Sequence, residues 1–144
     1  MEFDTESWVK VAAFTGAGLS MGFGAIGAAI GEGFAAAKAN EATSRNPLFS
    51  GDIFKMMLVG QAVAETAAIF ALVIGVLLLF ADYSAASMIS AAAMMAAGLC
   101  MGFGAMGSGV GSGYPAGEAC WGIARQPAMK GRLTTNMLIG SAVS

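Results

Sequence analysis

Long apolar segments alternate with short polar breaks along this chain. The apolar segments cover residues 8–42, 53–81, 85–124 and 131–144, and the first three exceed the ~20 residues with which an α-helix crosses a bilayer. The fourth is shorter, so we expect its helix to be incomplete. The pattern predicts an all-α membrane protein of two tandem transmembrane helical hairpins, with the fourth helix truncated.

The polar breaks are of two kinds. Residues 44–47 (Ser-Arg-Asn-Pro) and 125–127 (Arg-Gln-Pro) place a proline after a helix, whereas residues 82–84 (Asp-Tyr-Ser) form a short acidic turn. Most basic residues flank the first and third breaks: Lys38, Arg45, Lys55, Arg125, Lys130 and Arg132. The positive-inside rule therefore predicts that both Arg-x-Pro loops face the cytoplasm.

The second half of the chain repeats the first at a shift of 80 residues. This shift places residues 18–33 (GLSMGFGAIGAAIGEG) on 98–113 (GLCMGFGAMGSGVGSG), and 60–64 (GQAVA) on 140–144 (GSAVS). It also aligns the two Arg-x-Pro loops. Such self-similarity indicates a duplicated unit, so we expect a first hairpin at 1–83, with a complete ion site, and a second, incomplete hairpin at 84–144.

Glycines recur at short intervals in the first and third predicted helices. They are Gly18, Gly22, Gly27 and Gly31, and then Gly98, Gly102, Gly107 and Gly111. Small residues at such spacing let helix backbones approach closely in a membrane. A generic helix contact is the simpler reading, but a glycine-lined helix that occurs twice favours a tightly curved inner ring of helices.

Composition agrees with a membrane protein and excludes several function classes. The 144 residues are 57% hydrophobic and 11% charged, with no histidine. Cys100 and Cys120 stand alone, so a metal centre is not expected. No nucleophile–base set and no phosphate loop with a lysine occurs, which argues against a catalytic or nucleic-acid-binding chain. Acidic Glu2, Asp4 and Glu6 at the start do not fit a secretory signal.

Two carboxylates lie within the predicted spans. Glu32 and Glu65 are nearly equidistant from residues 47–48, so we expect them side by side, ~22 Å from the loop. Intramembrane carboxylates cost about 2.5–3.5 kcal/mol each and are functional by default, although a pair that only pins the hairpin is an alternative. Two anions cannot stay bare at short range, so they must share a proton or a cation. The Thr66 hydroxyl and Val63 carbonyl add oxygen ligands suited to Na⁺.

Glu118 has a different predicted role. It lies near the cytoplasmic end of the third predicted helix, where a solvated carboxylate or an ion pair with lysine is more natural than ion transport.

At these residues the chain resembles the c subunit, or proteolipid, of rotary ATP synthases along essentially its whole length. The glycine-repeat helix, the polar loop and residues 60–66 (GQAVAET) carry the resemblance. It implies a rotor ring that carries Na⁺ or H⁺ on Glu65 and couples ion flow to rotation, with no cofactor besides the ion. The implied partners are other copies in a ring, the stator a subunit with its arginine, the central stalk and membrane lipid. The implied stalk-contact residues are Arg45, Asn46 and Pro47, and Arg125, Gln126 and Pro127.

The resemblance leaves the ion open. In Na⁺-type members the ion is held by residues that match Glu32, Glu65, Thr66 and the Val63 carbonyl. Ala67 and Phe70 stand where such sequences often have Thr and Tyr, so a water-binding hydroxyl and a carboxylate-orienting phenol are missing. Both Na⁺ and H⁺ are therefore compatible with the site.

The tandem arrangement also resembles the fused four-helix proteolipids of vacuolar-type rotors. Ser112 stands where the first repeat has Glu32, and the counterpart of Glu65 would be residue 145. F-type and V-type complexes are both compatible with the sequence, and a prokaryotic cell membrane is expected. The competing hypothesis is a non-rotor oligomer of small-residue helices, such as a channel or a structural assembly, which would not require paired carboxylates.

Overall fold

The computed structural model describes residues 4–83 and 87–144, and this part of the chain is almost entirely helical. The elements are α1 (Thr5–Arg45), η1 (Pro47–Phe49), α2 (Ser50–Leu79), α3 (Met88–Arg125), η2 (Pro127–Met129) and α4 (Lys130–Val143). The predicted class and the two hairpins are confirmed. Glu2 and Ser84, named above, lie outside the described residues.

The turns of the two hairpins are copies of each other. α1 ends at Arg45 and α3 ends at Arg125, 80 residues later. The residues that follow have almost the same backbone angles, φ −140° and ψ 77° at Asn46 and φ −139° and ψ 77° at Gln126. In each hairpin a proline then opens a single 3₁₀ turn, a position where its missing N–H costs nothing. The duplication seen in the sequence is therefore also a structural one.

Among the described residues, three helical segments are long and apolar enough to cross a membrane: Thr5–Arg45, Pro47–Leu79 and Met88–Arg125. Side chains cap two of them at the N-terminus. Asp4 accepts a hydrogen bond from the Ser7 N–H at 3.0 Å, and Ser87 accepts one from the Ser90 N–H at 3.0 Å. These caps satisfy backbone donors that have no partner inside a helix.

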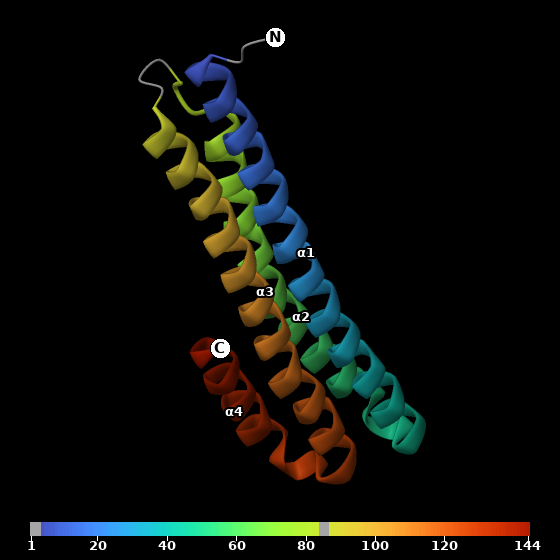
Figure 1. Cartoon of the computed structure of the whole chain (residues 1–144). Coiled ribbons are helices and arrows are strands. Elements are labelled where there is room, and N and C mark those ends of the chain that lie inside the picture. The colour runs from blue at the N-terminus through green and yellow to red at the C-terminus, as the bar shows by residue number, and fades with distance from the viewer. Residues whose placement is uncertain (1–3, 84–86) are drawn as a thin grey trace.

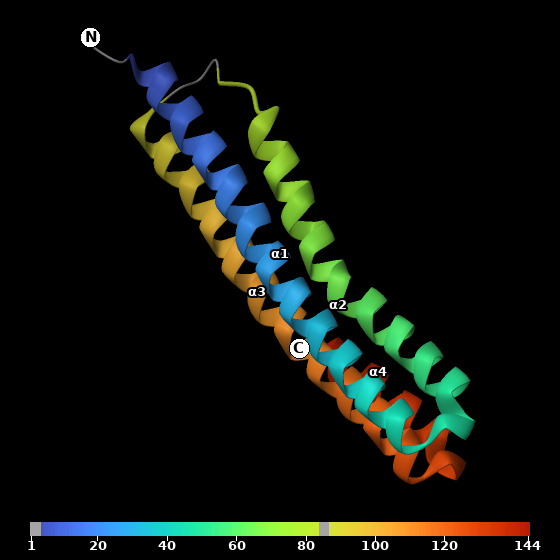
Figure 2. The ribbon, with the colours of Figure 1, turned by 90° about the vertical axis from the view of Figure 1, so that its right-hand side faces the viewer.

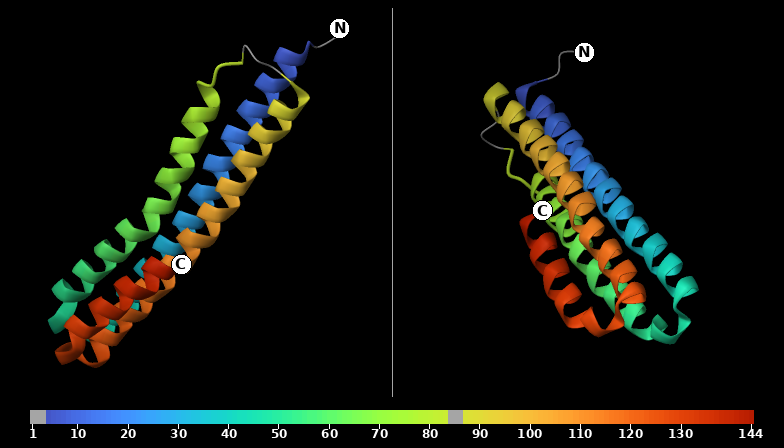
Figure 3. Two further views of the ribbon diagram at one scale, coloured as in Figure 1. Left: turned by 90° about the vertical axis from the view of Figure 1, so that its left-hand side faces the viewer. Right: turned by 90° about the horizontal axis from the view of Figure 1, so that it is seen from below.

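α1 and α3 run side by side, and α2 packs against both (Figures 1 and 2). Short α4 packs against α3 at the end of the molecule where both hairpin turns lie, and the described C-terminus lies part-way along the bundle (Figure 3). The main core cluster is at this turn end; half of its ten buried residues are alanines of α1 and α3, and the others include Ile53, Ile123 and Met137. The small side chains let α1 and α3 approach closely, and larger side chains of the other helices pack against them.

α1 approaches α3 closely at some of the α1 glycines that the sequence singles out, but not at all of them. A Cβ on Gly27 or Gly31 would collide with α3 backbone. At Gly18 and Gly22, no other described residue lies within 4 Å of such a Cβ. The four glycines therefore do not lie on one face of α1. Five residues separate Gly22 from Gly27, which turns the helix by about 140° between the two glycine pairs.

Candidate functional site

Glu32 of α1 lies against α2 in the first hairpin. The Gln61 side-chain Nε2 donates a hydrogen bond to the Glu32 backbone carbonyl at 3.3 Å. Glu65 lies four residues, about one helical turn, further along α2. Glu32 is partly buried in the single chain, whereas Glu65 is exposed. Across the hairpin, Glu32 therefore faces Gln61, about one helical turn of α2 from the level of Glu65.

The level of the two carboxylates differs from the prediction by about one turn. The partner of Glu32 across the hairpin is Gln61, and not Glu65. Small residues set this register: the Ser20 hydroxyl donates to the Ala71 carbonyl at 2.8 Å, and Gly24 packs against Ala71. Counting from residues 47–48 assumed a symmetric turn, which these contacts override.

Thr66 and Val63 are joined to each other within α2. The Thr66 hydroxyl donates to the Val63 carbonyl at 2.6 Å, and Thr66 is exposed beside Glu65. A hydroxyl that donates one hydrogen bond keeps lone pairs that can face a cation. Within the described residues, no group of three or more Cys, Asp or Glu side chains could hold a metal. The site therefore offers two carboxylates and neutral oxygens.

The second hairpin repeats the hydrogen bond between its two helices, but it has no carboxylate at the position equivalent to Glu32. The Ser141 hydroxyl donates to the Ser112 carbonyl at 3.2 Å, which matches the bond from Gln61 to Glu32. Ser112 itself is buried, and its hydroxyl donates to the Ser108 carbonyl at 2.8 Å. Sequence reasoning did not single out Gln61 or Ser141. Their alignment at the 80-residue shift was the signal that could have found them.

The six predicted stalk-contact residues lie together at the turn end of the molecule. Arg45, Pro47, Arg125 and Gln126 are exposed, and Asn46 and Pro127 are half-buried. The Asn46 side-chain amide donates to the Ala124 carbonyl at 3.1 Å and so ties one turn to the other hairpin. Lys130 of α4 pairs with Asp52 of α2 at 3.0 Å. These contacts hold the two turns together at one polar end of the molecule.

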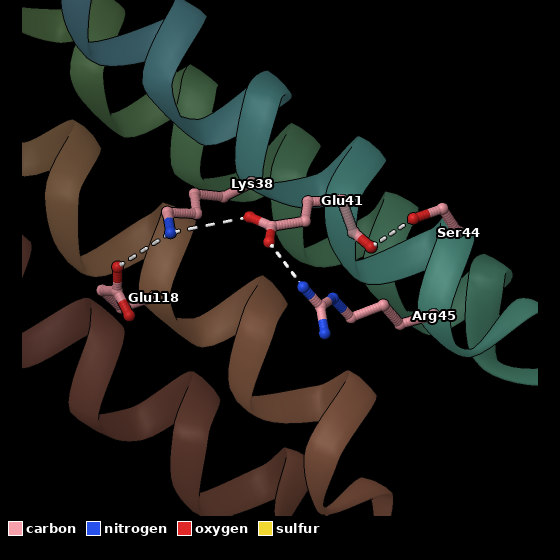
Figure 4. Close-up of polar contacts among 5 residues, drawn as sticks. All are labelled: Lys38, Glu41, Ser44, Arg45 and Glu118. Carbon is pink, nitrogen blue, oxygen red and sulfur yellow. Dashed lines mark hydrogen bonds and ion pairs between the residues drawn. The ribbon is translucent and has the colours of Figure 1, made fainter.

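Glu118 pairs with lysine, as predicted. Its Oε1 lies 3.8 Å from the Lys38 Nζ, and Lys38 also lies 3.7 Å from Glu41 (Figure 4). Glu41 contacts Arg45 at 3.3 Å, and the Arg45 guanidinium lies 4.6 Å from the centre of the Trp121 ring. This network occupies the polar end of the α1–α3 pair, away from the site of Glu32 and Glu65.

Comparison with known proteins shows the same duplication. The family model for the C subunit of ATP synthase matches residues 15–78 and again 95–144. The ATP synthase c subunit of Natranaerobius thermophilus is 56% identical over 79 residues, which cover 55% of this chain and 91% of that protein. The ATP synthase c subunit of Alkaliphilus oremlandii is 51% identical over 74 residues, covering 51% and 83%. The second ATP synthase c subunit of Cereibacter sphaeroides is 45% identical over 78 residues, covering 54% and 94%. About half of this chain therefore corresponds to nearly all of each relative.

Proposed function

Because the chain belongs to the family of ATP synthase c subunits and is thus a rotor component of that complex, we propose that it carries Na⁺ on Glu65, with H⁺ as the competing ion. The observation that supports this best is the position of Glu32 opposite Gln61, about one helical turn from Glu65 and the Thr66 hydroxyl. All these groups are hard oxygen ligands of the kind that Na⁺ takes.

Charge balance explains how such a site can cross lipid. A bare carboxylate in hydrocarbon is costly, so Glu65 can face lipid only when a proton or a cation neutralises it. If Glu32 keeps its proton, one negative charge on Glu65 balances one Na⁺. A stator arginine would then attract the Glu65 carboxylate and displace the ion, so that each step of rotation moves one charge.

The glycine faces support assembly into a ring. Gly98, Gly102 and Gly113 of α3 pack on α1, and their counterparts Gly18, Gly22 and Gly33 on α1 contact no other described residue within 4 Å of an added Cβ. The open side of α1 thus resembles the side of α3 that is already in contact. A next copy can dock its α3 there by the same heterologous contact, which closes by rotation.

The polar end supports contact with the stalk. Both Arg-x-Pro turns lie at this end, and exposed Arg45 and Arg125 give it positive charge. We place this end in the cytoplasm, because positive loops stay on that side of a membrane. There the turns would meet the central stalk, while the remaining helix surface contacts lipid and the stator a subunit.

Carbodiimide labelling tests the ion-carrying role. Glu65 should react with a hydrophobic carbodiimide when it is protonated, and Glu65→Gln should abolish both labelling and ion-coupled ATPase activity. Millimolar Na⁺ should protect Glu65, and more strongly as pH rises and fewer protons compete. If labelling of Glu65 decreases as pH rises but does not change when Na⁺ is added, the site binds protons and not Na⁺. Ion-coupled activity that survives Glu65→Gln would refute the assignment of Glu65.

A further inference from the structure

Lys38 and Glu118 occupy equivalent positions of the two repeats, 80 residues apart, and have opposite charges. They also contact each other: Lys38 Nζ lies 3.8 Å from Glu118 Oε1 across the α1–α3 interface (Figure 4). A contact between equivalent residues of neighbouring repeats has a geometric consequence. If a third repeat is added by the same displacement, its equivalent residue arrives beside Glu118 on the other side.

Two aromatic pairs follow the same rule. The rings of Phe23 and Phe103 stack with their centres 4.5 Å apart, and those of Phe34 and Tyr114 lie 4.4 Å apart. Both pairs join residues 80 positions apart. On α1 the members are spaced by 11 residues and then by 4 to Lys38, which keeps all three on one helix face. One face of the α1–α3 layer is therefore a row of matched pairs.

The α3 members of these pairs have an uncovered side. Phe103 is 52% exposed, Tyr114 is 53% exposed and the Glu118 side chain is 59% exposed, whereas the Lys38 side chain is only 30% exposed. Each residue on α3 has a neighbour on α1, and yet more than half of its surface remains exposed. In the ring proposed above, α1 of the next copy occupies this exposed flank.

We propose that Glu118 of each chain also faces Lys38 of the next copy, so that positions 38 and 118 form a closed belt of alternating charge around the inner helices. The inference rests on the proposed ring. The occupant of the open flank is a second copy of this chain, for two reasons. The contact continues one that already exists between the repeats, and the charge that α1 presents at this level is opposite to that of Glu118.

The belt would favour rings in which first and second hairpins alternate. Wherever a first hairpin meets a second hairpin, Lys38 meets Glu118. If two first hairpins or two second hairpins met instead, like charges would face each other, which is unfavourable. The α1–α3 contact would therefore be specific for alternation of the two hairpins, in addition to being close-packed by glycine.

A charge-exchange chain tests this proposal without removing the pair inside the chain. Lys38→Glu combined with Glu118→Lys keeps an opposite-charge contact within each chain, and rings made only of exchanged chains keep every contact between copies. In a ring that mixes exchanged and unchanged chains, each junction between the two kinds places like charges together. The experiment coexpresses the exchanged chain with an affinity-tagged unchanged chain, purifies rings by the tag and measures chain ratios by mass spectrometry.

The expected result is sorting: the exchanged chain should be about two- to five-fold rarer in tagged rings than in the membrane, the range for one exposed ion pair. Sorting should weaken when rings assemble at high salt. The control exchanges Glu6 and Lys10, which pair within α1, and this chain should mix at its share of the membrane pool.

Three outcomes overturn the belt in different ways. Rings in which the Lys38/Glu118 exchange mixes as freely as the control refute the belt and leave the ring intact. Absence of any ring from the unchanged chain refutes the ring and the belt together. If the exchanged chain does not accumulate, Glu118→Gln replaces it: its rings should dissociate more readily in detergent at low salt but not at high salt, and equal resistance at low salt refutes the belt.

Discussion

Gly27→Ala measures how closely α1 and α3 approach. A Cβ at Gly27 would collide with the backbone of Met106, and one at nearby Gly109 would lie 2.7 Å from the Ala28 nitrogen. Backbone cannot swing aside as a side-chain end can, so the helices must separate. Such overpacking costs about 1–3 kcal/mol, and the better helix propensity of alanine returns roughly 0.5–1 kcal/mol. The net expectation is a loss of up to about 2.5 kcal/mol.

Gly107→Ala is the matched control, because Gly107 is the counterpart of Gly27 in the second repeat. No other described residue lies within 4 Å of a Cβ at this position, so the single chain should gain roughly 0.5–1 kcal/mol from propensity alone. The assay is reversible unfolding of the detergent-dissociated chain, followed by circular dichroism. If the two substitutions change the free energy of unfolding by the same amount and sign, the close approach of α1 and α3 is refuted.

Three further substitutions separate the roles of neighbouring polar groups. Glu32→Gln should shift ion affinity without abolishing transport, because Gln61 binds the backbone of residue 32 and not its side chain; a loss of transport as complete as that of Glu65→Gln would contradict this. Thr66→Ala should weaken Na⁺ protection of Glu65 in the labelling assay, while Thr135→Ala, which also removes a hydroxyl bonded within its own helix, should leave protection unchanged. Asn46→Ala should destabilise the detergent-dissociated chain by about 1 kcal/mol through loss of its bond to the Ala124 carbonyl, and an unchanged unfolding midpoint would count against that tie.

The fold was largely predictable because its signals are periodic. The lengths of the apolar segments predicted the helices, and the self-similarity at a shift of 80 residues predicted the duplicated hairpin with its two proline turns. The register of Glu32 against α2 was not predictable from the sequence. Nothing local to Glu32 or Glu65 shows that Ser20 bonds to Ala71, because that contact depends on how two helices slide against each other. Gln61 was missed although the 80-residue shift aligns it with Ser141.

The glycine face shows a second limit of sequence reasoning. A spacing of four residues is visible at once in two pairs, Gly18 with Gly22 and Gly27 with Gly31. The step of five residues from the first pair to the second moves the second pair to another face of the helix. The two faces have different surroundings in the structure: Gly27 and Gly31 contact the second hairpin, whereas Gly18 and Gly22 remain open. A helix in the interior of a ring needs both faces small, one for each neighbour.

Fusion of two hairpins permits an asymmetry that identical hairpins cannot have. In a ring of identical single hairpins, every inner helix would carry the same residue at the level of Lys38, and a charge there would face its own kind all the way round. With two repeats in one chain, position 38 is lysine and position 118 is glutamate, so each charge has an opposite neighbour. The same freedom lets Glu32 be replaced by buried Ser112 in the second repeat while the backbone link to the next helix is kept. The second hairpin can thus preserve the geometry of the rotor without reproducing the paired-carboxylate site, which makes the two repeats structurally equivalent and chemically distinct.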